Sequence, residues 1–202
     1  MQHWQFAYRL SIRKQINHLE TLYQNIHHEA IEGCRKGDTK AQFELYKIYY
    51  KPMYNVCLRM VGNEVEAEDV MQEAFLNAFT KIDTYEGKVS FGAWLKRIVI
   101  NRSFDQLKKR KVKFFELNEK IPDEEPVNLE ISEIQMEQLK KAIQQLPDGY
   151  RVVLSLHLLE GYDHEEIAQI LGISNGSSRS QFLRAKLKLR QLLNKEVFFE
   201  YN

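Results

Sequence analysis

Basic and aromatic side chains occur together in the middle of the chain, in a pattern that suits nucleic acid. Tyr85, Phe91 and Trp94 stand before or at the start of the segment 96–113, which holds eight Lys and Arg residues and a single acid, Asp105. Aromatic rings can stack on unpaired bases, and closely spaced cations can follow a phosphate backbone. Extracting a base from a duplex costs about a few kcal/mol, so a protein that holds separated strands needs a pocket for that base. The segment therefore predicts a site for melted DNA, with its pocket at the glycine loop just before it.

A second candidate site lies near the C-terminal end, in DHEEIAQILGISNGSSRSQFLRAKLKLRQLL at 163–193. Asp163 can cap one helix, Gly172 permits a left-handed turn, and Ser174 or Asn175 can cap a second helix. We expect the second helix to bury Phe182 or Leu183, Leu187 and 189–193, and to keep Ser177, Ser178, Arg179, Gln181, Arg184 and Lys186 on its polar face. Short polar side chains followed by cations suit a helix that enters the major groove. The pattern indicates a helix-turn-helix; an ordinary helical corner with a solvated basic face is the alternative.

The sequence offers no recognisable enzyme site. It has no phosphate-cradling glycine loop and no nucleophile beside a base, and its six histidines lack metal-ligand spacing. The neighbours His27 and His28 would point about 100° apart on a helix, with no third ligand nearby. Cys34 and Cys57 lie among apolar residues, which predicts buried, reduced thiols and a cytoplasmic protein. We therefore expect a protein that is not an enzyme and holds no metal or cofactor.

Charge is strongly segregated, although the net charge of the 202 residues is only +1. The basic block at 96–113 is followed by a mainly acidic stretch from Glu116 to Glu137, and the segment 179–195 is basic again without an acid. Phosphate binding needs a local excess of Lys and Arg, which both basic blocks provide despite the small net charge. No apolar run approaches the roughly 18 residues needed to span a bilayer, so we expect no membrane insertion.

Helices must position these sites, because apolar residues recur every three or four positions nearly throughout. An aromatic-rich stripe at 4–26 predicts an N-terminal helix that packs within its own chain. Further helices are expected on both sides of Gly37-Asp38, at Glu66–Ile82, from Ser90 into the basic block, and on either side of breaks at Pro147, Gly161 and Gly172. The fold class that follows is all-α.

Residues 114–132 divide the chain. They contain Pro122, Pro126 and much of the acidic stretch but no sustained helical stripe, which predicts a flexible, self-repelling linker. We therefore expect two small helical domains joined by an acidic linker, the second being the helix-turn-helix domain. The expected limits are 1–29 for an N-terminal helical extension, 30–113 for the first domain, 114–132 for the linker and 133–195 for the second domain.

Three segments, taken together and in order, resemble one family. They are AEDVMQEAFLNAF at 67–79, DTYEGKVSFGAWLKRIVINRSFDQLKKRK at 83–111 and GYDHEEIAQILGISNGSSRSQFLRAKLKL at 161–189. These resemble regions two and four of the extracytoplasmic-function sigma factors of bacterial RNA polymerase, and the resemblance covers about Ala30 to Leu193. It implies a subunit that binds core RNA polymerase, recognises the minus-10 and minus-35 promoter elements and stabilises melted DNA. The implied partners are core RNA polymerase, promoter DNA and an anti-sigma factor.

The resemblance also implies roles for particular residues. It assigns contact with the clamp helices of the polymerase to Asp69, Gln72 and Glu73. It assigns the minus-10 element to Tyr85, Gly87, Lys88, Phe91, Arg97, Asn101, Arg102, Asp105, Lys108 and Lys109. It assigns the minus-35 element to Ser177, Arg179, Ser180, Leu183, Arg184 and Lys186. The acidic linker would run through the polymerase interior, where its charge imitates that of nucleic acid.

Some positions depart from the pattern of the family. Glu86 and Lys88 stand where relatives commonly show a basic and an acidic residue, and Ser178 and Gln181 replace a more usual apolar and a basic residue. The promoter sequence therefore cannot be transferred from relatives. For single motifs, the alternatives are a solvated acidic face at 67–79, core roles for Phe91 and Trp94, and a solubilising tail at 108–113. A helix-turn-helix regulator that is not a polymerase subunit is the alternative function, and it leaves the acidic helix unexplained.

Overall fold

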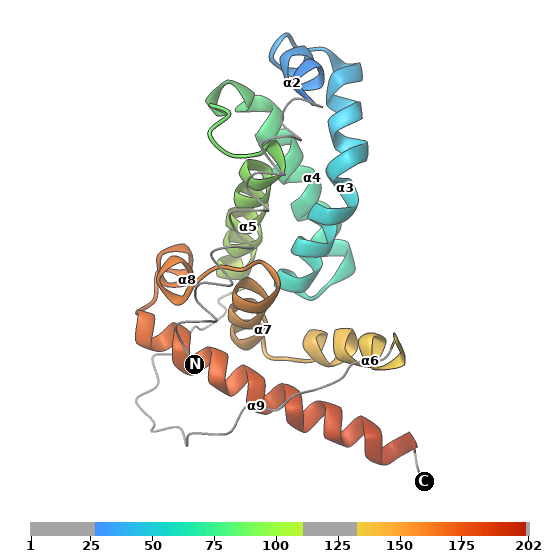
Figure 1. The fold of residues 1–202 in the computed structure, drawn as a ribbon, viewed down its shortest axis with the longest axis vertical. Coiled ribbons are helices and arrows are strands. Elements are labelled where there is room, and N and C mark those ends of the chain that lie inside the picture. Colours follow the sequence, from blue (N-terminus) through green and yellow to red (C-terminus); the bar gives the residue numbers. More distant parts are fainter. Residues whose placement is uncertain (1–26, 111–132, 201–202) are drawn as a thin grey trace, which may run out of the picture. The chain divides into compact units, whose positions relative to one another are not determined.

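The computed structural model of the chain describes residues 27–110 and 133–200, and every regular element within these two ranges is a helix (Figure 1). The predicted all-α fold is therefore confirmed. The predicted N-terminal helix at 4–26 and the predicted acidic linker at 114–132 lie outside the described residues. In the part that is described, no helix combines the length and the apolar character that crossing a membrane requires.

The chain forms two compact units. Unit 1 comprises Met1–Cys57 and Val65–Arg102, and unit 2 comprises Leu58–Glu64 and Ser103–Asn202. This division does not follow the predicted linker, because the end of one long helix and the last turns of another are grouped with the C-terminal helices. The domain limits given in the sequence analysis therefore stay a prediction.

The first half of the chain consists of four helices and one short turn: α2 (His28–Arg35), α3 (Thr39–Val61), α4 (Glu64–Thr80), the 3₁₀ turn η1 (Ile82–Thr84) and α5 (Phe91–Lys109). Helices α3 and α4 are separated at Gly62, whose φ of 71° suits glycine. Ser90 begins α5 as expected, because its Oγ accepts from the backbone N–H of Ala93 at 3.1 Å.

Helix α4 buries one face and exposes the other. Its buried residues are Ala67, Val70, Met71, Ala74, Phe75 and Ala78. Phe79, which lies on the same side of the helix, is half-buried. Because the buried residues recur every three or four positions, the acidic residues between them must face outward.

Both cysteines are buried, as expected. Burial, and then the nearby carboxylate of Asp38, raises the pKa of Cys34 to about 11. The thiol of Cys34 is therefore protonated and unreactive at neutral pH.

The second half consists of α6 (Glu133–Gln144), α7 (Asp148–Leu154), a π-helical turn η2 (Ser155–Leu159) that continues α7, α8 (His164–Leu171) and α9 (Asn175–Glu200). A hydrophobic cluster of Ile143, Leu146, Leu154 and Ala185 joins α6, α7 and α9, with Leu139, Tyr150, Leu189 and Leu192 packed around it. This cluster provides the platform on which the following helix-turn-helix is built.

Arg151 is the polar centre of unit 2. Its guanidinium is only 3% exposed and donates to the carbonyl oxygens of Arg59 at 3.1 Å and Met60 at 3.2 Å, which belong to the end of α3. It also donates to the carbonyl of Leu146 at 3.0 Å and to the carboxylate of Asp148. The last carbonyls of a helix have no partner within the helix, so Arg151 caps the C-terminus of α3.

Candidate nucleic-acid interface

The outward face of α4 carries the three residues predicted to bind polymerase. Asp69, Gln72 and Glu73 are all exposed. Two large apolar side chains share this face, Val65 at 71% exposure and Leu76 at 68%. Residues 65, 69, 72, 73 and 76 lie three or four positions apart along the helix, so they form one stripe. An acidic stripe with apolar ends suits a protein partner better than a purely solvated surface. Val65 and Leu76 were not predicted to belong to this surface, although their spacing from Asp69 and Gln72 is visible in the sequence.

The loop between η1 and α5 is organised by a cluster of three aromatic rings. The ring of Tyr85 lies 5.6 Å from that of Phe91 and 5.4 Å from that of Trp94, measured between centroids. The hydroxyl of Tyr85 donates to the carbonyl of Val89 at 2.8 Å, which closes the loop. Tyr85 and Phe91 are buried at 5% and 2% exposure, while Gly87 and Lys88 are exposed. The buried rings do not favour direct stacking of a base on Tyr85 or Phe91, whose assigned roles stay predictions.

A cavity of about 280 Å³ lies beside this loop. Its lining comes from α2 and from the loop, and consists of His28, Ile31, Glu32, Arg35, Tyr85, Glu86 and Gly87. Arg35 fixes the loop against α2, since its Nη2 donates to the carbonyl oxygen of Tyr85 at 2.6 Å and its Nη1 lies 3.5 Å from the carboxylate of Glu32. The α2 residues that line this cavity could not be predicted from the sequence, because the approach of α2 to the loop is a tertiary contact.

Most of the residues from Arg97 to Lys109 that are predicted to contact the minus-10 element are exposed to solvent. Arg97, Asn101, Asp105, Lys108 and Lys109 are exposed, and Arg102 is half-buried. Arg102 points toward α4, where the amide oxygen of Asn77, in the orientation that satisfies both groups, accepts from its Nε at 3.0 Å and its Nη2 at 2.7 Å. The exposed members at 97, 101, 105 and 108 are spaced by three or four residues, so one side of α5 presents them together.

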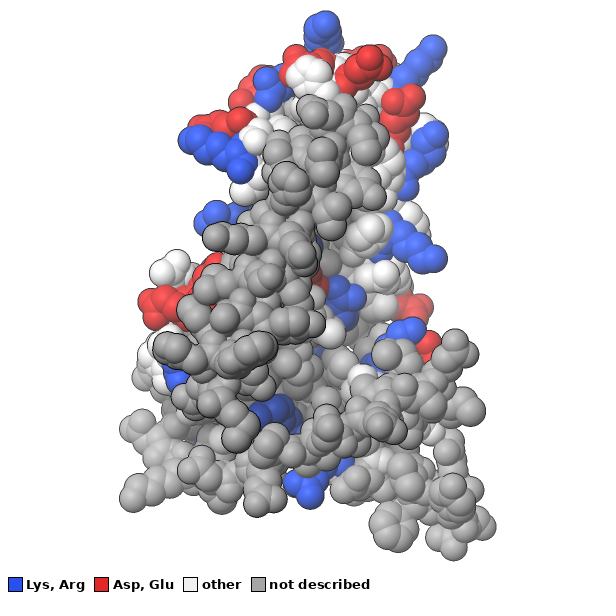
Figure 2. All heavy atoms as spheres, in the orientation of Figure 1, with Lys and Arg blue, Asp and Glu red and all other residues white. Residues whose placement is uncertain are grey.

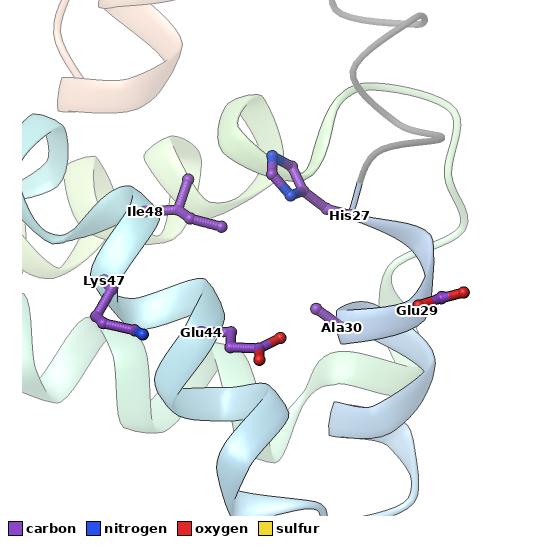
Figure 3. Close-up of a pocket in the computed structure, with 6 residues that line it drawn as sticks. All are labelled: His27, Glu29, Ala30, Glu44, Lys47 and Ile48. Atoms are coloured by element: carbon purple, nitrogen blue, oxygen red, sulfur yellow. The ribbon is translucent and has the colours of Figure 1, made fainter.

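The surface around α2 and α3 differs from this cationic helix. Figure 2 shows Lys and Arg side chains alternating with Asp and Glu at the end that carries α2, without a uniform basic patch. A hollow of about 450 Å³ there is lined by His27, Glu29, Ala30, Glu44, Lys47 and Ile48 (Figure 3). Across the residues that the structure describes, no three His, Cys, Asp or Glu side chains are grouped so that they could hold a metal ion.

The predicted helix-turn-helix is formed by α8 and α9. Asp163 and Glu166 make a reciprocal capping box at the start of α8, and Gly172 ends the helix with a φ of 63°. Of the two candidates for the next cap, Ser174 is the residue that caps α9, because its Oγ accepts from the backbone N–H of Ser177 at 3.1 Å. The local chemistry of the corner was therefore readable from the sequence.

The polar face predicted for α9 is partly wrong. Ser177, Ser178 and Gln181 are buried, at 6%, 0% and 3% exposure, together with Ala185 at 0%. The predicted alternatives for burial, Phe182 and Leu183, are only half-buried. The reason is that small side chains allow the first turns of α9 to approach the rest of the corner closely. Burial of Ser177 does not favour a base contact, and its assigned role stays a prediction.

The remaining predicted minus-35 residues share one side of α9. At 100° per residue, positions 179, 180, 183, 184 and 186 fall within a single sector opposite the buried residues Gln181 and Ala185. Arg179 and Lys186 are exposed, and Ser180, Leu183 and Arg184 are half-buried. Arg179 is steadied by Asn175, whose Oδ1 accepts from its Nε at 2.8 Å. This sector offers guanidinium, hydroxyl and apolar groups from one helix, as direct reading of base edges requires.

Comparisons with known proteins agree with this arrangement. Family models described as Sigma-70 region 2 and Sigma-70, region 4 match residues 45–112 and 136–189. The chain is 32% identical to the ECF RNA polymerase sigma factor SigW of Bacillus subtilis over 181 residues, which cover 81% of this chain and 94% of that protein. It is 30% identical to the RNA polymerase sigma-H factor of Pseudomonas aeruginosa over 178 residues, which cover 82% of this chain and 92% of that protein.

A solved structure has the same fold. The sigma factor RpoE of Bartonella quintana, determined in complex with the anti-sigma factor NepR, aligns with a TM-score of 0.51 at 24% identity, and the alignment covers 75% of this chain and 95% of that chain. The two family models and the 32% identity to SigW identify the family. The chain belongs to the extracytoplasmic-function (ECF) sigma factors of bacterial RNA polymerase.

Proposed function

We propose that this chain joins core RNA polymerase as its sigma subunit and directs promoter-specific initiation through the minus-10 and minus-35 elements. The observation that carries the proposal is the presence, in one chain of this family, of an outward acidic stripe on α4 and a sector of exposed and half-buried polar and basic side chains on α9. A helix-turn-helix regulator needs the second feature but not the first.

Binding to polymerase is assigned to α4. Asp69, Gln72 and Glu73 supply hydrogen-bond acceptors and negative charge, and Leu76 supplies an apolar anchor in the open. Interfaces derive much of their affinity from a few apolar or aromatic anchors surrounded by polar groups. We therefore assign the contact with the polymerase clamp helices to this stripe, with Leu76 added to the three residues that the family resemblance implies.

The minus-10 element is assigned to the loop before α5 and to the exposed side of α5. Gly87 and Lys88 are open to solvent, and the cavity beside them has polar walls from α2. We propose that a base extracted from the duplex enters near Gly87 while Arg97, Asn101 and Lys108 follow the separated strand. In this proposal the buried rings of Tyr85 and Phe91 support the loop by packing and do not contact the base.

The minus-35 element is assigned to the exposed sector of α9. Arg179 and Arg184 can each donate two hydrogen bonds to a guanine edge, Ser180 can donate or accept one, and Leu183 can contact a thymine methyl group. Lys186 stands farther along the helix, where a phosphate contact suits its compact charge. The helix would enter the major groove with its first turns, as recognition helices do.

Further parts of the proposal follow from family membership. We propose that the chain has no catalytic activity of its own, works in the cytoplasm and is restrained by an anti-sigma factor, as the solved relative RpoE is captured with NepR. We also retain 30–113 as the polymerase and minus-10 domain, 114–132 as the connecting linker and 133–195 as the minus-35 domain. Each of these is open to direct test by fractionation, co-purification and limited proteolysis.

Two assays separate a sigma factor from a stand-alone regulator. In the first, core RNA polymerase transcribes genomic fragments with and without the purified chain, and new run-off transcripts are expected only when both are present. In the second, a promoter found in this way is mixed with the chain alone in a gel-shift experiment, and tight binding without polymerase is not expected. Tight, sequence-specific binding by the free chain, with no new transcripts in the first assay, would favour the regulator.

A further inference from the structure

The first turns of α9 are held in place by polar contacts. Their buried side chains are Ser177, Ser178, Gln181 and Ala185, none of which has a large apolar surface. Burial of these four side chains therefore contributes little apolar area to fixing this part of the helix. A buried hydroxyl destabilises a fold unless it has a hydrogen-bond partner. The hydroxyl of Ser178 has one, since its Oγ lies 2.9 Å from Nδ1 of His164.

The ring of His164 is itself held in place by the ring of His157. His164 is the first residue of α8, and its ring stacks on that of His157 with a centroid distance of 4.3 Å and an interplanar angle of 13°. Nδ1 of His157 lies 2.9 Å from the carbonyl oxygen of Tyr162. Because a carbonyl can only accept, Nδ1 of His157 carries the hydrogen, and this bond fixes the orientation of the His157 ring. The ring of His164 therefore stacks on a ring whose orientation is fixed.

Phe182 provides the second contact between α9 and this histidine pair. It lies one turn beyond Ser178 and meets both rings edge-on, at centroid distances of 4.5 Å from His157 and 5.5 Å from His164. One turn farther, Nζ of Lys186 stands 5.1 Å above the centroid of the Phe182 ring. Ser178, Phe182 and Lys186 thus form a line along α9, and the first two of them touch the histidine pair.

The charge state of His164 indicates that the residue positions its neighbours and does not bind phosphate. Burial, followed by the proximity of His157 and Arg179, lowers the pKa of His164 to about 4. The ring is therefore uncharged at neutral pH, and it adds no positive charge to the DNA-facing side of the domain. A contact with phosphate would call for a cation.

We propose that His164 is a positioning residue for recognition of the minus-35 element, and that it fixes the rotation of α9 about its own axis through Ser178 and Phe182. This inference rests on the proposed assignment of α9 to that element. Arg179 directly follows Ser178, so any rotation that separates Ser178 from His164 also moves Arg179. Binding groups must be held within about 0.5 Å of their productive geometry, so a small rotation is enough to weaken base reading.

The test compares His164→Phe, Ser178→Ala and the double variant, with Gln169→Ala on the exposed side of α8 as the matched control. Each full-length chain is combined with core RNA polymerase and a pool of linear templates that share one minus-10 region and carry a randomised minus-35 region. Sequencing of the transcripts gives the preference of each holoenzyme for its best minus-35 sequences over the average of the pool. Thermal melting of each free chain is recorded in parallel.

The single variant His164→Phe is expected to melt at a lower temperature, because it leaves the buried Ser178 hydroxyl without its partner. The double variant removes that hydroxyl as well, so its melting temperature is expected to recover. The minus-35 preference is expected to fall about tenfold in His164→Phe, which is the size of the loss from one mismatched base pair. In the double variant the preference is expected to stay equally low. Gln169→Ala is expected to match the wild type in both measurements.

Two results would overturn the proposal. One is a double variant that regains both stability and minus-35 preference, since His164 would then contribute only to stability. The other is an unchanged preference in His164→Phe. Arg179→Ala, assayed beside them, identifies a different failure: if it also leaves the preference unchanged, the assignment of α9 to the minus-35 element is wrong, whatever the role of His164.

Discussion

Arg179 is the α9 residue to which the proposal assigns the reading of one minus-35 base. It is exposed near the start of the helix, and Asn175 holds its Nε at 2.8 Å. Asn175 is in turn bound through its Nδ2 to the carboxylate of Glu165 at 3.1 Å, which links the arginine to α8. A guanidinium that is oriented in this way loses less freedom when it meets a base edge.

Replacing Arg179 by Ala is expected to cost about 1 to 3 kcal/mol of promoter binding and to relax specificity at one minus-35 position. Lys109→Ala is the matched comparison. If Lys109 contacts a phosphate, its loss should weaken binding to all promoters evenly. Holoenzyme binding to a promoter and to its minus-35 point variants measures both effects. An equal loss on scrambled promoters after Arg179→Ala would contradict its role in base reading.

The lowered pKa of His164 predicts a pH dependence of stability. Burial is its main cause, His157 and Arg179 add to it, and Asp163 opposes it only in part. A histidine in the unfolded chain titrates near pH 6.5, so between about pH 6.5 and pH 4 the unfolded chain binds a proton that the folded chain does not. Stability should therefore fall as the pH drops through this window. Urea denaturation at pH 7 and pH 5 of the wild type and of His164→Asn checks this, and an equal pH dependence in both proteins would contradict it.

At the scale of helices, the sequence was most informative where structure is decided by near neighbours. The capping box of Asp163 and Glu166, the left-handed Gly172 and the buried stripe of α4 all follow from residues within one or two turns. The sequence was least informative where two elements meet. The side of α9 that is buried depends on how closely α8 and α9 approach, and the contact of Arg35 with the carbonyl of Tyr85 joins positions 50 residues apart. No local pattern encodes either contact.

The exposed stripe of α4 predicts an effect on polymerase binding. Leu76→Ala removes an apolar side chain that is 68% exposed in the free protein, so it should leave stability nearly unchanged and weaken binding to core polymerase about tenfold, which is the effect of a modest interface anchor. Ile48→Ala, at an apolar position of 44% exposure on α3, is the control. Titration of labelled chain with core enzyme measures the affinities. Equal binding by Leu76→Ala and the wild type would remove Leu76 from the proposed interface.

The cap that Arg151 places on α3 predicts an effect on stability. Arg151→Met keeps much of the side-chain volume but leaves the carbonyls of Arg59 and Met60 without this donor, and it removes the ion pair between Arg151 and Asp148. The expected loss is about 3 to 5 kcal/mol, as for the removal of one partner from a buried charge network. Lys141→Met, at an exposed position of α6, should change stability by less than about 0.5 kcal/mol. Chemical denaturation measures both, and similar midpoints for the two variants would contradict the capping role.

Over the whole molecule, function requires that two reading surfaces belong to one chain. The loop and exposed side of α5 suit separated strands, whereas the sector of α9 suits intact duplex. The fold class could be predicted from apolar periodicity, the helix-turn-helix from the segment 163–193, and the family from the order of three sequence motifs. The grouping of Leu58–Glu64 with the C-terminal helices could not, because it involves tertiary contacts such as those of the buried Arg151, about 90 residues farther along the chain.

The most direct test of the central claim is run-off transcription by core RNA polymerase on genomic DNA, with the wild-type chain and with Glu73→Lys, which reverses one charge of the α4 stripe. The account predicts new transcripts from discrete start sites with the wild-type chain and a marked loss of them with the variant at equal protein concentration. The absence of any new start site with the wild-type chain, under conditions in which the same core enzyme responds to another sigma factor, would contradict it.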